Sequence, residues 1–88
     1  MAVRYRIEVR SEAKRQLAAL PGPTRRRIDA KIQALAEDPR PVGAKKLVGS
    51  GELWRIRVGN YRVLYAIEDN VLVVIVVKIG HRQHVYRR

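Results

Sequence analysis

The stretch Trp54–Tyr65, WRIRVGNYRVLY, decides how this chain folds. Two runs of β-prone residues flank positions 59–60, a Gly-Asn pair, and glycine at the first central position is typical of a type II′ hairpin turn. In that register Arg57 lies directly opposite Arg62, and the alternation of side chains puts Arg55 on the same face. The other face carries only apolar and aromatic side chains: Trp54, Ile56, Val58, Tyr61, Val63 and Tyr65. The stretch therefore predicts an antiparallel hairpin with one core face and one cationic face.

The cationic face of this hairpin contains no carboxylate. Like charges placed directly opposite each other on a strand ladder cost up to about 1 kcal/mol, so stability alone does not explain the arrangement. One interpretation is the solvated outer face of a sheet, where arginine stems cover apolar surface and the guanidinium groups stay in water. Three clustered arginines without an acid favour a second interpretation, a binding site for an anionic partner.

The composition also indicates a polyanionic partner. The chain has 19 lysines and arginines against 8 aspartates and glutamates, which gives a formal net charge of +11. Such an imbalance is typical of proteins that bind nucleic acids. With 88 residues, of which 47% are hydrophobic, the sequence predicts one globular domain over residues 1–88.

Several other classes of protein do not fit this sequence. Because it has no cysteine, the chain forms no disulfide, thiolate metal site or cysteine nucleophile. Its first residues alternate charged and apolar side chains, unlike a signal peptide. The longest apolar run, Val71–Val77, is far shorter than the roughly 20 residues that span a bilayer, so we expect no membrane association. The cytoplasm is the expected compartment.

Hydrophobic spacing predicts the elements that precede the hairpin. Alternation over Val3–Val9 predicts a half-buried strand. Ser11 is the expected N-cap of a helix that ends at a Pro-Gly-Pro turn over 21–23, and Thr24 is the expected N-cap of a second helix that ends at Pro39. The second helix carries an apolar stripe made of Ile28, Ile32 and Leu35. Two helices joined by a short turn predict a helical hairpin that covers one face of a sheet.

The rest of the chain completes the predicted sheet. After a loop over Arg40–Glu52 and the hairpin, the apolar run Val71–Ile79 predicts a central strand buried on both faces. The pair Val85-Tyr86 is a candidate for a short edge strand. The order is therefore β-α-α-β-β-β, an α+β fold in which an N-terminal helical hairpin covers a small antiparallel sheet of four to five strands.

Few residues are left that could carry chemistry. No strand presents two carboxylates together, no serine lies in a nucleophile motif, and His81 and His84 have neither a helix nor a third ligand to hold a metal. We therefore expect no metal and no cofactor. Arginine binds phosphate bidentately and stabilises a phosphorane, while histidine and tyrosine transfer protons or stack on bases. The hairpin arginines with Arg82, the two histidines and Tyr86 thus suit cleavage of RNA by its own 2′-hydroxyl, although Tyr86 could equally be an edge residue and His84 a solvent-facing one.

Two segments carry a resemblance to a known family, KKLVGSGELWRIRVGNYRVLYAI at 45–67 and VKIGHRQHVYRR at 77–88. Their most specific motifs are K-L-x-G, G-x-Y-R-x-x-Y and G-H-R-x-x-V-Y. Together they resemble the RelE/ParE superfamily of type II toxin-antitoxin toxins, in particular its RelE branch. The resemblance implies a small sheet covered by two helices and an mRNA endonuclease that cuts codons in the ribosomal A site, inhibited by a cognate RelB-like antitoxin.

Carried onto this sequence, the resemblance implies two sets of site residues. The catalytic candidates are Arg57, Arg62, Arg82, Tyr86 and His81. The candidates for RNA binding are Arg55, Lys45, Lys46, His84 and Arg87. In well-known RelE members the two first-strand positions are lysines, one of them proposed as the general base, whereas both are arginines here. Because a guanidinium group stays protonated, we expect the proton acceptor among His81, His84 and Tyr86 instead.

Two other functions stay open at this stage. A ParE-like protein would share the fold but inhibit DNA gyrase by binding, without catalytic residues. A catalytically weakened homologue would bind RNA or antitoxin only, which the missing lysines leave open. The cationic hairpin together with the G-H-R-x-x-V-Y motif favours the nuclease.

Overall fold

The computed structural model describes residues 3–49 and 51–81. Over these residues the chain forms five strands and two helices. The strands are β1 (Arg6–Val9), β2 (Lys45–Lys46), β3 (Leu53–Val58), β4 (Tyr61–Glu68) and β5 (Val73–His81), and the helices are α1 (Ser11–Ala18) and α2 (Gly22–Ala34). The predicted strand at Val85-Tyr86 lies outside the described residues, as do Arg82, His84 and Arg87.

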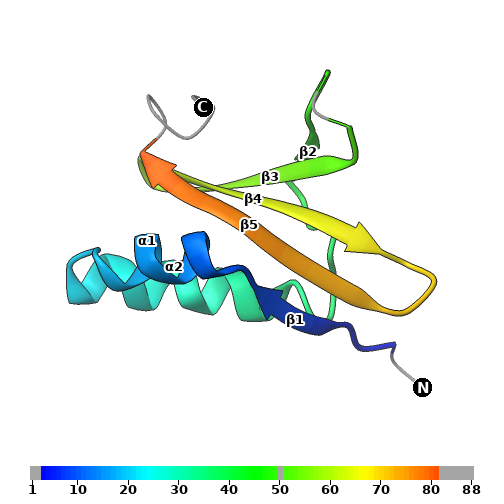
Figure 1. Ribbon diagram of the computed structural model, residues 1–88, viewed down its shortest axis with the longest axis horizontal. Helices are drawn as coiled ribbons and strands as arrows, with labels where there is room; N and C mark the ends of the chain where they lie inside the picture. Colours follow the sequence, from blue (N-terminus) through cyan, green and yellow to red (C-terminus); the bar gives the residue numbers. More distant parts are fainter. Residues whose placement is uncertain (1–2, 50, 82–88) are drawn as a thin grey trace.

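The five strands form one sheet in the order β1-β5-β4-β3-β2, and both helices cover the same face of it (Figure 1). This confirms the predicted α+β fold with a helical hairpin on a small sheet. The sheet is mixed, however, because β1 pairs parallel with β5 while the other neighbours pair antiparallel. Parallel neighbours need a long connection. Here both helices and three strands separate β1 from β5 along the chain, so the two strands can run in the same direction.

The two helices begin differently from the sequence-based expectation. Ser11 is the first helical residue of α1, and the N-cap is Arg10, which makes no side-chain capping bond. Thr24 lies inside α2, which begins at Gly22 with Pro21 as its N-cap. Both predicted caps were therefore wrong. Pro23 explains the earlier start of α2, because the fixed φ of proline suits the first turn of a helix, where its missing N–H is not needed.

The core lies between the helices and the inner face of the sheet. Ile28, Ile32 and Leu35 are buried, which confirms the predicted apolar stripe. The helix itself ends at Ala34 with Leu35 as its C-cap, so the predicted end at Pro39 was wrong. They pack in one cluster with Val63, Tyr65, Val74 and Val76 from the sheet. The Tyr65 hydroxyl donates a hydrogen bond of 2.7 Å to the Pro39 carbonyl oxygen. Burial raises the pKa of Tyr65 to about 12, so this donor stays protonated at neutral pH.

The central hairpin has the predicted turn and register. Gly59 has a φ of 61°, which glycine adopts without strain, and Arg57 pairs with Arg62 across β3 and β4. Strand β5 is an interior strand, as predicted, but Ile75 and Val77 on it are only half-buried. The expectation of complete burial on both faces was wrong because, among the described elements, the helices cover only the inner face (Figure 1).

Candidate nucleic-acid interface

Five basic side chains lie in two adjacent rows on the outer face of the sheet. Partners across a ladder share a face, so the register of the strands defines the rows. The first row contains Lys45, Arg55, Leu64 and Lys78, and the second contains Arg57, Arg62 and Gly80. We call these five cations, Lys45, Arg55, Arg57, Arg62 and Lys78, the basic rows. They belong to β2, β3, β4 and β5, so the sheet brings together residues up to 33 positions apart.

The basic rows contain no carboxylate. The ion pairs found among the described residues lie elsewhere: Arg4–Glu37, Arg6–Glu8, Arg40–Asp69 and Lys46–Glu52. Neither Arg55 nor Arg57 takes part in an ion pair within the described part of the chain. Like charges gathered on one face create a positive potential that concentrates anions there. The charge of the rows therefore suits an anionic partner.

Arg62 is buried, unlike its cross-strand partner. Only 7% of its surface is accessible, whereas Arg57 is exposed. Arg62 Nη1 donates a hydrogen bond of 3.3 Å to the carbonyl oxygen of Tyr61. Leu64, the next outer-face residue of β4, is only 5% accessible. A solvated outer face therefore does not describe this part of the sheet, and the Arg62 guanidinium is held in a restricted position.

His81 lies on the other side of the sheet from the two paired arginines. It is the ladder partner of Tyr61, whose ring packs against the core, while the preceding Gly80 is the partner of Arg62. The Tyr61 and His81 rings make an edge contact with 5.8 Å between centroids and an interplanar angle of 78°. Consequently the register does not bring His81 onto the face that carries Arg57 and Arg62.

The two adjacent lysines of β2 lie on opposite faces of the sheet. Lys45 pairs with Arg55 and so belongs to the basic rows, whereas Lys46 pairs with Trp54 on the inner side and makes a 3.3 Å ion pair with Glu52. Lys78 is not predicted as a site residue by the sequence, because it lies within the apolar run Val71–Ile79, which predicts a strand buried on both faces. Its alternation is masked by an irregularity in the β4–β5 register, which skips Val77.

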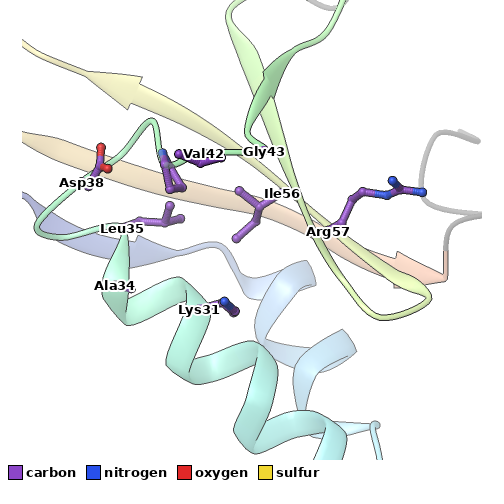
Figure 2. Close-up of a pocket in the computed structure, with 9 residues that line it drawn as sticks. Lys31, Ala34, Leu35, Asp38, Val42, Gly43, Ile56 and Arg57 are labelled. Carbon is purple, nitrogen blue, oxygen red and sulfur yellow. The ribbon is translucent and has the colours of Figure 1, made fainter.

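An apolar cleft of about 260 Å³ adjoins the basic rows at Arg57. It lies between α2, the loop that follows α2, and β3 (Figure 2). Leu35, Val42 and Ile56 line its apolar part, and Lys31 supplies a second cation beside Arg57. Ile56 and Arg57 point to opposite sides of β3 (Figure 2). The cleft and the basic rows thus meet at a single side chain.

A polar cluster anchors the loop that borders this cleft. Arg40 donates two hydrogen bonds to Asp69, of 2.8 and 3.3 Å, and its guanidinium lies 5.3 Å from the Trp54 ring centroid. The Tyr5 hydroxyl donates a 2.6 Å hydrogen bond to the same carboxylate. The hydrogen bonds from Arg40 and then Tyr5 lower the pKa of Asp69 below its ordinary value. This cluster connects the loop to both the β4–β5 turn and the start of the sheet.

Neither a metal site nor a membrane-spanning helix is found among the described residues. Over 3–49 and 51–81, no group of three or more His, Cys, Asp or Glu side chains could hold a metal ion. In the same ranges no helix is long and apolar enough to cross a membrane.

The fold and the motifs of the central hairpin match a known family of toxins. Residues 7–86 match the sequence profile described as the ParE toxin of type II toxin-antitoxin system, parDE. The chain belongs to the RelE/ParE superfamily of type II toxins. The expected family is therefore confirmed, and the match spans nearly all of the toxin.

Relatives of this toxin cover nearly its whole length. Toxin RelG of Mycobacterium tuberculosis is 31% identical over 91 residues, which cover 96% of this chain and 98% of RelG. The toxin-antitoxin complex RelBE2 of M. tuberculosis contains a chain with a TM-score of 0.82 and 26% identity, covering 93% of this toxin and 95% of that chain. The archaeal RelE-RelB complex of Pyrococcus horikoshii gives a TM-score of 0.79 and 29% identity, with coverages of 91% and 97%.

Proposed function

We propose that this toxin is an mRNA endonuclease that acts on mRNA in the ribosomal A site and thereby inhibits translation. The observation that carries the proposal is the Arg57–Arg62 pair within the basic rows, where two arginines lie directly opposite each other on the same face of the sheet. Bidentate guanidinium contacts match the geometry and the charge of a phosphodiester. The similarity to RelE-named toxins supports the same function.

The proposed reaction uses the nucleophile that RNA already contains. The 2′-hydroxyl oxygen attacks the adjacent phosphorus as its proton leaves, and a pentavalent phosphorane forms. The bond from phosphorus to the 5′-oxygen then breaks, the 5′-oxygen takes up a proton, and a 2′,3′-cyclic phosphate remains. No redox partner or cofactor is needed, because both the attacking and the leaving oxygen belong to the RNA. The protein must hold the phosphate, stabilise the extra negative charge and move protons.

In this proposal Arg57, Arg62 and Arg82 hold the scissile phosphate and stabilise the phosphorane. The restricted position of Arg62 suits transition-state stabilisation, since a preorganised donor needs no reorganisation during the reaction. Tyr86 orients or stacks on a neighbouring base. The proton acceptor is among His81, His84 and Tyr86, and the inner-side position of His81 favours the other two. Further contacts to the RNA come from Arg55, Lys45, Lys46, His84 and Arg87.

Purified toxin incubated with translating ribosomes tests this proposal. New 5′ ends mapped on the mRNA should cluster at A-site codons, and they should disappear with Arg57→Ala or Arg82→Ala. Arg6→Ala is a matched control, because Arg6 is an exposed arginine paired with Glu8 away from the basic rows. Intact mRNA at saturating wild-type toxin would refute the nuclease function.

A second candidate function follows from the family description. The matching profile is named for ParE toxins, and a ParE-like toxin would inhibit DNA gyrase by binding. A supercoiling assay with purified gyrase separates the two, since we expect the proposed nuclease to leave supercoiling unchanged.

We also propose a cognate RelB-like antitoxin as the partner of this toxin. Solved relatives are complexes with RelB, which supports a partner of the same type here. The cleft beside Arg57 combines an apolar lining with the cations Lys31 and Arg57, which outnumber its one acid, Asp38. An acidic, amphipathic antitoxin segment matches that combination, because it would bury an apolar side chain and neutralise the rim together.

A further inference from the structure

Three consecutive arginines, Arg25, Arg26 and Arg27, form a second basic cluster in the first two turns of α2. We call them the α2 arginines. All three are exposed, and none takes part in the ion pairs found among the described residues. The α2 arginines belong to the helical layer, so neither the family motifs nor the basic rows of the sheet include them.

Arg27 reaches from the helix to the turn of the cationic hairpin. A methyl group placed on Gly59 would lie 3.7 Å from Nη2 of Arg27 and 4.0 Å from its Nη1. Gly59 follows β3 directly and is two residues from Arg57. The guanidinium of Arg27 therefore lies against the hairpin turn, and the second of the basic rows is the row nearer to this turn. The α2 arginines and the basic rows thus approach each other at this end of the molecule.

The other two α2 arginines lie over the start of the same helix. A methyl group on Gly22 would be 3.3 Å from Nη1 of Arg26 and 3.9 Å from Nη2 of Arg25. The N-terminus of a helix carries a partial positive charge, and cations are disfavoured there. α2 has no acidic residue in its first turn to offset them, and its single acid is Asp29 in the following turn. One carboxylate does not balance three arginines, whereas binding to an anion would.

Four of the eight acids of the chain lie at the other end of the molecule. Glu37 and Asp38 follow the C-terminal end of α2, and Glu68 and Asp69 lie at the β4–β5 turn. Figure 1 shows this end opposite the β3–β4 turn and the start of α2. Asp29 lies within α2, but the three α2 arginines outnumber it. The end where the α2 arginines and the hairpin turn meet is therefore the more favourable one for a polyanion.

The surroundings of the α2 arginines favour RNA over a protein as the partner. Protein interfaces have an apolar centre surrounded by polar residues. The exposed large hydrophobic residues found in the described ranges lie elsewhere: Val3, Val42, Val48, Val71 and Leu72. A cluster of guanidinium groups without an apolar anchor matches the repeated phosphates of a nucleic-acid backbone instead.

We propose that the α2 arginines bind phosphates of the same RNA strand that occupies the basic rows, and so form a second contact beyond the hairpin turn. This proposal rests on the proposed RNA-directed function. It assigns the α2 arginines to RNA affinity and leaves the chemical step to the hairpin and the C-terminal motif.

The test compares two double variants with the same change in charge. Arg25→Ala with Arg27→Ala removes two α2 arginines, and Arg4→Ala with Arg6→Ala removes two exposed arginines paired with acids elsewhere. Alanine is the best helix former, so α2 should persist, and circular dichroism with thermal unfolding verifies this. Binding of a fluorescein-labelled single-stranded RNA is measured over a salt series. The magnitude of the slope of log K against log salt should fall by about 1.4 in the first variant, because each lost phosphate contact on a single strand contributes about 0.7. It should be unchanged in the second.

Arg25→Lys with Arg27→Lys should restore most of the salt slope, since the charges return. On ribosomes, the first alanine variant should need more toxin for half-maximal cleavage but reach the wild-type rate at saturation. RNA affinity and salt slope equal to those of the control variant would overturn the proposal. Retained RNA binding combined with lost antitoxin binding would also overturn it and assign the cluster to a protein partner.

The experiment separates this proposal from the nuclease proposal. If wild-type toxin cleaves no mRNA but the α2 variant loses RNA affinity, the nuclease function fails and the RNA contact stands. If wild-type toxin cleaves mRNA and the α2 variant binds as the control does, only the RNA contact fails.

Discussion

Arg57 and Arg62 are direct partners across the β3–β4 ladder, yet Arg57 is exposed and Arg62 is 7% accessible. Two like charges therefore share one position of the sheet in different environments. The buried guanidinium is held by a hydrogen bond to a backbone carbonyl, and the exposed one is free of ion pairs among the described residues. In the proposed function, Arg62 would make a fixed contact with phosphate, and Arg57 one that adapts as the RNA binds.

Replacing Arg57 should separate activity from stability. Arg57→Ala should abolish growth arrest and mRNA cleavage, because it removes an exposed phosphate ligand. The free energy of unfolding should stay the same or rise by a few tenths of a kcal/mol, since a like-charge ladder pair is removed. Urea unfolding and a growth assay measure the two effects. Full toxicity of this variant would contradict the assigned role.

Replacing Arg62 should affect both properties. Arg62→Ala should lower the free energy of unfolding by about 1 to 2 kcal/mol, because the buried stem loses its packing. Arg62→Met is the matched variant: it keeps an unbranched stem and removes the guanidinium, so stability should fall less while cleavage is still lost. Equal destabilisation by both variants would show that the stem contributes little.

Tyr65 should make the protein sensitive to alkali. Its pKa is raised to about 12 by burial, against about 10 in an unfolded chain. Because the folded state holds the hydroxyl proton of Tyr65 more tightly than the unfolded chain does, the neutral hydroxyl stabilises the fold fully below pH 10. This contribution is lost as the pH rises towards 12. Tyr65→Phe should cost about 1 to 2 kcal/mol at pH 7, because the Pro39 carbonyl loses its donor. The difference between variant and wild type should shrink between pH 10 and pH 12 in unfolding experiments.

Asp69 should contribute to stability with the opposite dependence on pH. Hydrogen bonds from Arg40 and Tyr5 lower its pKa in the folded state. Its contribution is therefore complete above about pH 4, the ordinary pKa range of aspartate, and is lost as the pH falls through the lowered value. Asp69→Asn should flatten the acid side of the stability profile. The effect should diminish in high salt, because the pair is about half exposed. An unchanged profile would contradict the role of this cluster.

Val42 provides a test of the antitoxin site. This side chain is fully exposed at the cleft beside Arg57, and Val48 is equally exposed but does not line the cleft. Val42→Asp should weaken antitoxin binding by at least about tenfold, since it removes an apolar contact and repels an acidic partner. Val48→Asp should bind as the wild type does. Titration calorimetry with the purified antitoxin measures both, and equal weakening would place the antitoxin elsewhere.

The N-caps of the helices and the pairing of β1 with β5 are features that local sequence patterns did not predict correctly. Ser11 and Thr24 are good capping residues, but both lie inside the helices. Because the fixed φ of Pro23 suits the first turn of a helix, α2 begins two residues before Thr24. No comparable local feature explains why α1 begins at Ser11. The parallel pairing of β1 with β5 involves residues more than 60 positions apart. No local pattern encodes such a pairing, because it depends on how the two helices pack on the sheet and so position the strands that follow them.

The sequence by itself determined the hairpin and its cationic face, because both follow from a two-residue turn and the alternation of side chains along adjacent strands. It also determined the family and the inward stripe of α2. Only the tertiary structure decided that Arg62 is buried, that Lys78 joins the basic rows and that Arg27 reaches Gly59. These relationships depend on the packing of β5 and α2 against the hairpin. Long-range packing leaves little signal in the residues on either side of a position.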